Sequence, residues 1–234
     1  MSEDSRERQR VRKSHVVMKK FIIISGNIGS GKSSLTKLLS KRLGWKAFYE
    51  VVENNPYLED FYYDMKKWSF HLQIFFLSKR FQHHQTIARE PSSVVQDRSI
   101  YEDVDIFAKN LYEQGLMESR DYHNYRELFS IMVDFLSPPN LIIYLQASVD
   151  TLKRRIALRG RDYEKRISRA YLEQLNILYE KWLEGFTVCP ILTVPTDDLD
   201  FVQRTEHLQL ITEKILTKLQ GVEKVSFDLT DVKD

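Results

Sequence analysis

The sequence has very little cysteine, since Cys189 is the only one among 234 residues. An internal disulfide bond is therefore impossible, and a metal or redox site built on a Cys-x-x-Cys pair is excluded. The six histidines show no metal-ligand spacing beyond the adjacent pair His83 and His84, so we expect no zinc site.

Long hydrophobic runs are also missing. No apolar stretch approaches the roughly 18 residues needed to cross a membrane. The N-terminus contains acidic residues and no apolar core, unlike a signal or transit peptide. We therefore expect a soluble, cytoplasmic protein. With 42% hydrophobic and 12% aromatic residues, a chain of this length can fill the core of one domain.

There is no large excess of charge of either sign, because 35 Lys and Arg residues face 33 Asp and Glu residues. Residues 1–20 hold seven basic and three acidic residues, so the rest of the chain is slightly acidic. A folded nucleic-acid binder usually needs a clustered basic face, and we expect none. Residues 1–17 are interpreted as a solvated basic tail or a leftover leader before a start at Met18, rather than a nucleic-acid-binding arm. The predicted domain covers 18–220, and 221–234 are expected to fray.

Short apolar runs alternate with helical patterns, and no internal repeat, low-complexity tract or long linker interrupts them. Strands are predicted over residues 19–25, 46–51, 93–96, 140–146 and 190–194. Helices are predicted over 33–43, 68–87, 149–158, 170–183 and 206–219, and a capping box from Ser99 to Glu102 opens another. Five apolar strands alternating with helices predict an α/β fold whose parallel sheet is covered on both faces.

A glycine-rich loop lies between the first predicted strand and helix. It reads Gly26-Asn27-Ile28-Gly29-Ser30-Gly31-Lys32-Ser33-Ser34, which contains the spacing G-x4-G-K-S. Glycines let backbone N–H groups turn inward around phosphate oxygens, the lysine reaches the outer phosphates, and the serine after it can ligate magnesium. Kinases, ATPases and GTPases share this loop, so it predicts phosphate binding and leaves the acceptor open.

Four further segments accompany the loop: EVVENNPY at 50–57, WSFHLQ at 68–73, QDRS at 96–99 and RIALRGR at 155–161. In this order and spacing, the sequence closely resembles the deoxyribonucleoside kinase family, particularly its bacterial deoxyadenosine, deoxycytidine and deoxyguanosine kinases. The resemblance implies a P-loop kinase fold, with a five-stranded parallel sheet, helices on both faces and an arginine-rich lid. It also implies ATP-dependent 5′-phosphorylation of deoxyribonucleosides for nucleotide salvage, with Mg²⁺, by a homodimer that binds neither nucleic acid nor membrane.

The resemblance assigns the transfer chemistry to the ends of two strands. Glu50 matches a carboxylate beside the nucleoside 5′-hydroxyl, where it can take the hydroxyl proton. Arg98 is expected to contact the 5′-oxygen or the phosphates. Asp97, where many animal members have glutamate, is expected to hold magnesium through water or to share the role of base. Without the resemblance, Glu50 could be a solvated side chain, and Asp97 and Arg98 could form a structural ion pair.

A second group of residues is assigned to the sugar and the base. In the family, residues matching Tyr62 and Glu164 contact the 3′-hydroxyl, Gln73 matches a base-reading glutamine, and Arg80 matches an arginine near the base. Asp103 matches a second base contact, although a carboxylate in a first helical turn also suits the helix dipole. An ionised Asp103 only accepts hydrogen bonds, so deoxyadenosine and deoxycytidine are predicted over thymidine and deoxyguanosine.

Three arginines are assigned to the lid. Arg155 and Arg159 share a helical face, and Arg161 follows in a loop. Fixed positive charge over the transferring phosphoryl group suits this chemistry, although a solvated stripe of arginines is the plainer alternative. Asp200 and Phe201 resemble an adenine-edge contact of the family, with a one-residue slip.

Two other functions compete with the deoxynucleoside kinase. A thymidylate-type kinase shares the loop and lid but needs extra cations for the acceptor's phosphate, whereas Tyr62, Gln73 and Glu164 suit a neutral sugar and base. A non-catalytic phosphate-loop module is disfavoured by the presence of Lys32, Glu50 and the lid arginines. A deoxyguanosine kinase stays open, because Arg80 or a protonated Asp103 could accommodate guanine.

Overall fold

The computed structural model describes residues 18–50 and 55–227. The expected basic tail at 1–17, part of the expected C-terminal tail at 228–234, and residues 51–54 of the EVVENNPY segment lie outside the described residues. No helix in the described part of the chain is long and apolar enough to cross a membrane.

Five parallel strands form one sheet in the order β2-β3-β1-β4-β5. They are β1 (Phe21–Gly26), β2 (Lys46–Phe48), β3 (Val94–Asp97), β4 (Leu141–Gln146) and β5 (Ile191–Pro195). The central strand β1 is buried along its whole length, because a strand covered on both faces is apolar without alternation. The predicted five-stranded parallel sheet is confirmed, although β2 ends at Phe48 rather than continuing towards residue 51.

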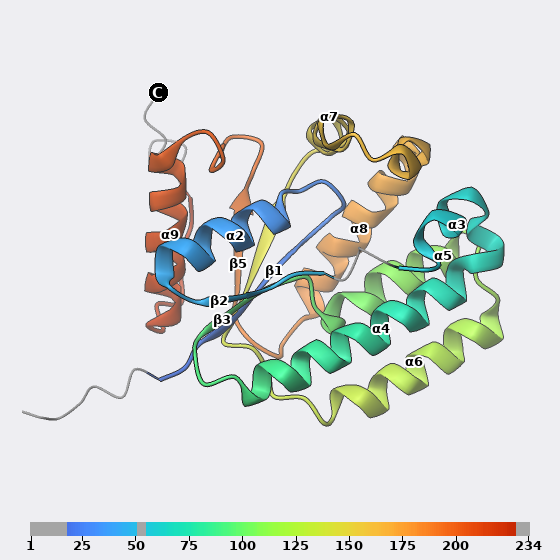
Figure 1. Cartoon of the computed structure of the whole chain (residues 1–234), viewed down its shortest axis with the longest axis horizontal. Coiled ribbons are helices and arrows are strands. Elements are labelled where there is room, and N and C mark those ends of the chain that lie inside the picture. The colour runs from blue at the N-terminus through green and yellow to red at the C-terminus, as the bar shows by residue number, and fades with distance from the viewer. Residues whose placement is uncertain (1–17, 51–54, 228–234) are drawn as a thin grey trace, which may run out of the picture.

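Helices cover both faces of the sheet (Figure 1), and a hydrophobic layer lies on each face. Successive side chains of β1 enter opposite layers, so Ile22 and Ile24 pack on one face and Ile23 on the other. The first layer is formed with α2 (Lys32–Leu43) and α9 (Thr205–Leu219). The second is formed mainly with α4 (Met65–Arg89) and α8 (Arg169–Gly185). In the segment expected to fray, Val225 and Phe227 are half-buried against the first layer.

The remaining helices lie between these elements in the sequence. They are α3 (Leu58–Tyr63), α5 (Lys109–Glu113), α6 (Ser119–Val133) and α7 (Val149–Arg159). Short 3₁₀ turns occupy Ile100–Glu102 and Asp162–Arg166, and a π-helix occupies Asp103–Ala108. Helices α3 and α6 were not predicted from the sequence, and the segment after Ser99 forms a 3₁₀ turn followed by a π-helix instead of the predicted ordinary helix. One half of the predicted capping box is present as a hydrogen bond from Ser99 N to Glu102 Oε1 of 3.1 Å.

The carboxyl ends of the strands bring the predicted site residues to one edge of the sheet. The phosphate loop follows β1, Glu50 lies just beyond β2, and Arg98 follows β3. The loop can begin only with glycine, because Gly26 has a φ of 143°. A Cβ at that position would lie 2.8 Å from the Leu145 carbonyl oxygen of the neighbouring strand. The turn into the loop is therefore packed directly against β4.

Candidate active site

One cleft of about 1320 Å³ opens at this edge of the sheet. The predicted site residues that line it are Ile28, Gly29, Gly31, Lys32, Ser33, Ser34, Glu50, Tyr62, Gln73, Arg80, Asp97, Arg98, Arg155, Arg159, Arg161, Glu164, Asp200 and Phe201. The predicted residues that are buried and do not line it are Gly26, Asn27, Ser30 and Asp103. Residues from both halves of the sequence therefore meet around one space.

Lys32, at the first position of α2, turns back over the phosphate loop. Its Nζ donates to the carbonyl oxygens of Gly26 at 2.9 Å and Asn27 at 2.8 Å. Burial, followed by the positive charge of Arg98, lowers the pKa of Lys32 to about 7. The charge of Lys32 is thus poorly compensated in the free protein, and an anionic phosphate would supply the missing partner.

Asn27 fastens the loop to α8. Its Nδ2 donates to the Leu172 carbonyl oxygen at 3.0 Å and to Asn176 Oδ1 at 2.7 Å. Its Oδ1 accepts from the N–H of Ile28 at 2.7 Å, and Asn176 donates in turn to the Ala147 carbonyl oxygen at the end of β4. Sequence reasoning missed Asn176, because a single polar residue in an amphipathic helix carries no signal of its partner.

Ser33 and Asp97 form a candidate magnesium site. Ser33 Oγ donates to Asp97 Oδ2 at 2.5 Å, and Asp97 Oδ1 is buried with no hydrogen-bond partner among the described residues. Burial raises the pKa of Asp97, an effect that a nearby cation would oppose. Residues 18–50 and 55–227 contain no cluster of three or more metal-ligating His, Cys, Asp or Glu residues. One hydroxyl and one carboxylate nevertheless fit Mg²⁺, which typically takes few protein ligands and completes its shell with water and phosphate oxygens.

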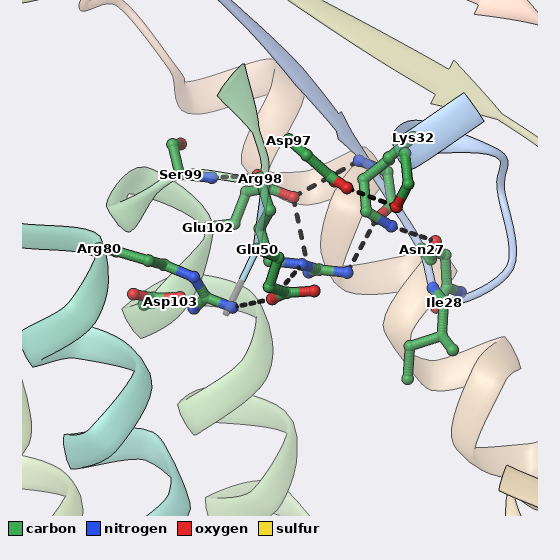
Figure 2. A network of polar contacts seen from close by, with 12 residues as sticks. Asn27, Ile28, Lys32, Glu50, Arg80, Asp97, Arg98, Ser99, Glu102 and Asp103 are labelled. Atoms are coloured by element: carbon green, nitrogen blue, oxygen red, sulfur yellow. Dashed lines mark hydrogen bonds and ion pairs between the residues drawn. The ribbon is translucent and has the colours of Figure 1, made fainter. Parts of the chain in front are cut away.

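Glu50 lies between two arginines (Figure 2). Its Oε1 is 3.0 Å from Arg98 Nε and is also ion-paired with Arg80, which pairs in turn with Asp103. Burial alone would raise the pKa of Glu50, but the charges of Arg98 and then Arg80 outweigh it and lower the pKa to about 2. Glu50 is therefore an ionised and largely desolvated carboxylate rather than a solvated side chain.

Arg98 has an unusual backbone as well as buried charge. Its φ is 60°, and no other non-glycine residue in the described part of the chain has a positive φ. Its guanidinium lies over the Phe107 ring at 4.2 Å from the centroid. Its carboxylate partners are Glu50 and Glu102, rather than the neighbouring Asp97. Strained backbone of this kind concentrates at functional sites.

Polar groups without partners gather where the nucleoside base is expected. Gln73 is buried and its Oε1 has no hydrogen-bond partner among the described residues. The same holds for Arg80 Nε and for Asp103 Oδ2, while Leu72 and Phe76 add apolar surface to the cleft. Buried polar atoms are normally paired, so the unpaired atoms of Gln73 and Arg80, two residues that line the cleft, indicate a site for a ligand that supplies donors and acceptors.

The three predicted lid arginines make two different kinds of contact. Arg159 donates to Glu164 through Nε at 2.9 Å, and Arg161 Nη1 lies 3.3 Å from the other oxygen of Glu164. Arg155 instead donates to the Ser30 carbonyl oxygen at 3.1 Å and to the Thr196 carbonyl oxygen at 2.6 Å. Arg155 therefore joins the phosphate loop to the end of β5, whereas Arg159 and Arg161 share one carboxylate over the cleft.

Asp200 and Phe201 lie on the loop between β5 and α9. The N–H of Asp200 donates to His207 Nδ1 at 2.8 Å, and Asp200 Oδ1 accepts from the N–H of Val202 at 3.1 Å. Phe201 is mostly buried, and its Cζ would lie 3.1 Å from a Cβ placed on Gly31. Phe201 therefore packs on the phosphate loop, with part of its surface lining the cleft.

These features define a class of protein: a phosphate-loop phosphotransferase, with the loop on β1, acidic and basic side chains at the next strand ends, and arginines over the cleft. Residues 22–220 match the family described as deoxynucleoside kinase. The chain belongs to the deoxynucleoside kinase family, which acts by ATP-dependent phosphorylation.

Individual relatives agree with this assignment. The deoxyadenosine/deoxycytidine kinase of Bacillus subtilis is 42% identical over 212 residues, covering 90% of this chain and 98% of that protein. The deoxyguanosine kinase of Lactobacillus acidophilus is 37% identical over 216 residues, covering 88% and 94%. The structure of deoxyadenosine kinase from M. mycoides with the products dCMP and dCDP has a TM-score of 0.75 and 33% identity, covering 86% of this chain and 100% of that one. The resemblance identified from the sequence is confirmed, and the thymidylate-type kinase and the non-catalytic module are set aside.

The low pKa of Lys32 predicts proton uptake when ATP binds. At pH 8 the free amine is largely neutral, whereas a bound phosphate favours its charged form, so uptake should approach about one proton. At pH 6 Lys32 is already charged, so its own uptake should be small. Calorimetric titration with ATP in buffers of different ionisation enthalpy measures this number. Lys32→Arg, which stays charged at both pH values, should lack the uptake at pH 8, and equal uptake in both proteins would contradict the assignment.

Proposed function

We propose that the protein transfers the γ-phosphoryl group of MgATP to the 5′-hydroxyl of deoxyadenosine and deoxycytidine, in preference to deoxyguanosine and thymidine. The observation that carries this preference is the buried pair of Arg80 and Asp103. One oxygen of Asp103 is paired with Arg80, and the other has no hydrogen-bond partner among the described residues.

An Asp103 carboxylate paired with a permanently charged guanidinium only accepts hydrogen bonds. It therefore favours the exocyclic amino groups of adenine and cytosine, whereas guanine O6 and thymine O4 would face it acceptor to acceptor. Gln73 both donates and accepts, so it can pair with the amino group and the adjacent ring nitrogen of either base. Solved structures of the M. mycoides deoxyadenosine kinase hold bound dATP and bound dCTP, one nucleotide of each favoured base.

The proposed transfer depends on Glu50 as the base and on Lys32 and Arg98 as the neighbouring positive charges. Arg80 and Arg98 both contact Oε1 of Glu50, so we propose that the other oxygen, Oε2, accepts the proton of the 5′-hydroxyl. A carboxylate with a pKa of about 2 is a weak base. It suits a loose transition state, in which bond formation to the attacking oxygen is little advanced and the proton leaves late. Lys32 and Arg98 then stabilise charge on the transferring group.

Ser33 and Asp97 would hold Mg²⁺, which supplies charge neutralisation and orientation of the phosphate oxygens when bound. We assign Arg159 and Arg161 to the equatorial oxygens of the transferring group. Glu164, which now pairs with both arginines, and Tyr62, whose ring stacks on Tyr163 at 5.6 Å, are assigned to the 3′-hydroxyl.

The base preference is tested by measuring kcat/KM for the four deoxynucleosides. Deoxyadenosine and deoxycytidine should exceed the other two by roughly 10-fold to 100-fold, the discrimination of one bidentate contact. Asp103→Asn offers a donor in place of an acceptor and should narrow this ratio. The control Asp105→Asn changes an exposed carboxylate of the same π-helix and should leave the ratio unchanged. A preference for deoxyguanosine would make the protein a deoxyguanosine kinase, with the transfer chemistry intact.

The role of Glu50 is tested by Glu50→Gln, which keeps the shape and removes the proton acceptor. We expect kcat to fall by about 100-fold or more, with little change in ATP affinity. The exposed Glu59→Gln, on α3, is the matched control and should be as active as the wild type. Turnover of Glu50→Gln near the wild-type rate would transfer the role of base to Asp97.

We further propose that the protein is a homodimer that associates through α6. This helix packs beside α4 at the edge of the molecule (Figure 1) and leaves apolar side chains exposed. Ile131 is 55% exposed, and Phe135, just after the helix, is 76% exposed. Contiguous apolar surface on a monomer commonly marks an interface, and a second copy presents the same face for a two-fold contact.

Sedimentation equilibrium should therefore report twice the mass of one chain. Ile131→Glu places a charge in the proposed interface and should shift the protein towards a monomer. Ile177→Glu, on α8, alters an isoleucine of similar exposure away from α6 and should stay dimeric. A monomeric wild-type protein at micromolar concentration would exclude this interface.

A further inference from the structure

Glu102 and Tyr179 are two fully buried polar residues behind the candidate site. Neither lines the cleft, and the mechanism proposed above assigns neither a role. They come from different parts of the chain, Glu102 from the turn after β3 and Tyr179 from the middle of α8. Burial of a carboxylate is costly unless its oxygens are satisfied, so their contacts show what they stabilise.

The carboxylate of Glu102 joins three segments. Its Oε1 accepts from Ser99 N, while its Oε2 lies 2.6 Å from the Tyr179 hydroxyl and 3.4 Å from Gly26 N. Oε2 is also 3.7 Å from Arg98 Nη1 (Figure 2). One carboxylate thus holds the end of β1, the end of β3 and α8 together.

The Gly26 carbonyl oxygen is a second meeting point. Lys32 Nζ and Arg98 Nη2 donate to it at 2.9 Å and 3.4 Å, and the Tyr179 hydroxyl lies 2.8 Å from it. The Tyr179 oxygen also accepts from Arg98 Nη1 at 3.3 Å. Burial, together with the charge of Glu102, raises the pKa of Tyr179, so the hydroxyl keeps its single proton and can donate it to the Gly26 carbonyl oxygen or to Glu102 Oε2. Lys32 and Arg98 are therefore both positioned by hydrogen bonds to one backbone atom, the Gly26 carbonyl oxygen.

The contacts of Arg98 with Glu102 and Tyr179 complement two other contacts of its guanidinium group. Glu50 attracts its Nε from the cleft, and Phe107 covers one face of the guanidinium. The Tyr179 ring packs edge-on against Phe107 at 6.3 Å between centroids, so the same residue supports the stacking partner. Glu102 and Tyr179 supply the restraint on the side of the phosphate loop.

We propose that Tyr179 and Glu102 are positioning residues that fix the Arg98 guanidinium relative to the phosphate loop, so that the turnover rate depends on two side chains that never touch substrate. The inference rests on the proposed role of Arg98 in the transfer. Small displacements of a transition-state group reduce the rate steeply while substrate binding is retained, so the effect belongs to kcat rather than to KM.

The test compares Tyr179→Phe with Tyr144→Phe. Tyr144 is equally buried and stacks on Tyr179 at 5.3 Å, but its hydroxyl lies 3.5 Å from Glu180 Oε1, away from Arg98. We expect Tyr179→Phe to lower kcat by about 10-fold, with the KM values for ATP and deoxynucleoside within about twofold of the wild type. Tyr144→Phe should retain kcat. Circular dichroism checks that both variants are folded at the assay temperature.

Glu102→Gln provides a second variant. One end of the amide must place N–H groups where a carboxylate oxygen now accepts, so either Ser99 N or Gly26 N meets a donor. We expect kcat to fall by at least as much as in Tyr179→Phe. Because both changes break the same support, the double variant should be no slower than Glu102→Gln alone. Additive losses would overturn a shared role.

Arg98→Ala separates failure of this inference from failure of the proposed transfer. If Arg98→Ala keeps the wild-type kcat, the proposed role of Arg98 falls, and the positioning role falls with it. If Arg98→Ala is inactive while Tyr179→Phe retains kcat, or changes only KM, the transfer role stands and the positioning role is overturned. Should Tyr179→Phe fail to fold, the same split between kcat and KM in Glu102→Gln decides the matter.

Discussion

The interaction on which the site depends is the mutual neutralisation of buried charge at the carboxyl edge of the sheet. Lys32, Arg80 and Arg98 are nearly inaccessible to solvent, and Asp97, Glu102 and Asp103 are equally buried. Desolvating any one of these groups alone would cost several kcal/mol, roughly the size of the net stability of a domain. The charges are tolerated only because each lies beside a partner of opposite sign or beside oriented backbone groups, and this requires the strand ends to be held in fixed positions.

That requirement explains why so much of the scaffold converges behind the cleft. Helix α8 contacts the first residues of the phosphate loop through the Leu172 carbonyl, Asn176 and Tyr179, on one face of the helix. Arg155 connects the loop to the end of β5. Some of the groups that face the cleft are left incompletely paired, including Gln73 and Asp97. Most charged groups of the network are paired within the protein, and the polar atoms that lack a partner in the cleft are the ones available to bind a ligand.

The features that could be predicted from the sequence are those formed by residues close together in the chain. The apolar run of β1 and the loop spacing from Gly26 to Ser33 are contiguous, and the family resemblance placed Glu50 and Arg98 because their motifs are short. The contact between Tyr179 and Glu102 was not predicted, since the two residues are separated by 77 positions and each looks ordinary in its own helix or turn. Helix α6 was not predicted either, although Tyr122, Tyr125, Phe129 and Met132 recur in its sequence at helical spacing.

The π-helix at Asp103–Ala108 has a consequence for how this region can change length. Its wider turn accommodates one residue more than an α-helix would, with Asp103 beside Arg80 at its start and Phe107 over Arg98 near its end. Deleting one residue within it would restore α-helical hydrogen bonding and leave the residues that follow in nearly the same rotational setting. Asn110 and Leu111 would keep their places in the core, but the shortened turn could not present both Asp103 to Arg80 and Phe107 to Arg98. Insertions and deletions should accordingly be purged from this segment in natural lineages and collect instead in exposed turns, such as the one at Gly115, where no neighbouring atom lies within 4 Å of an added Cβ.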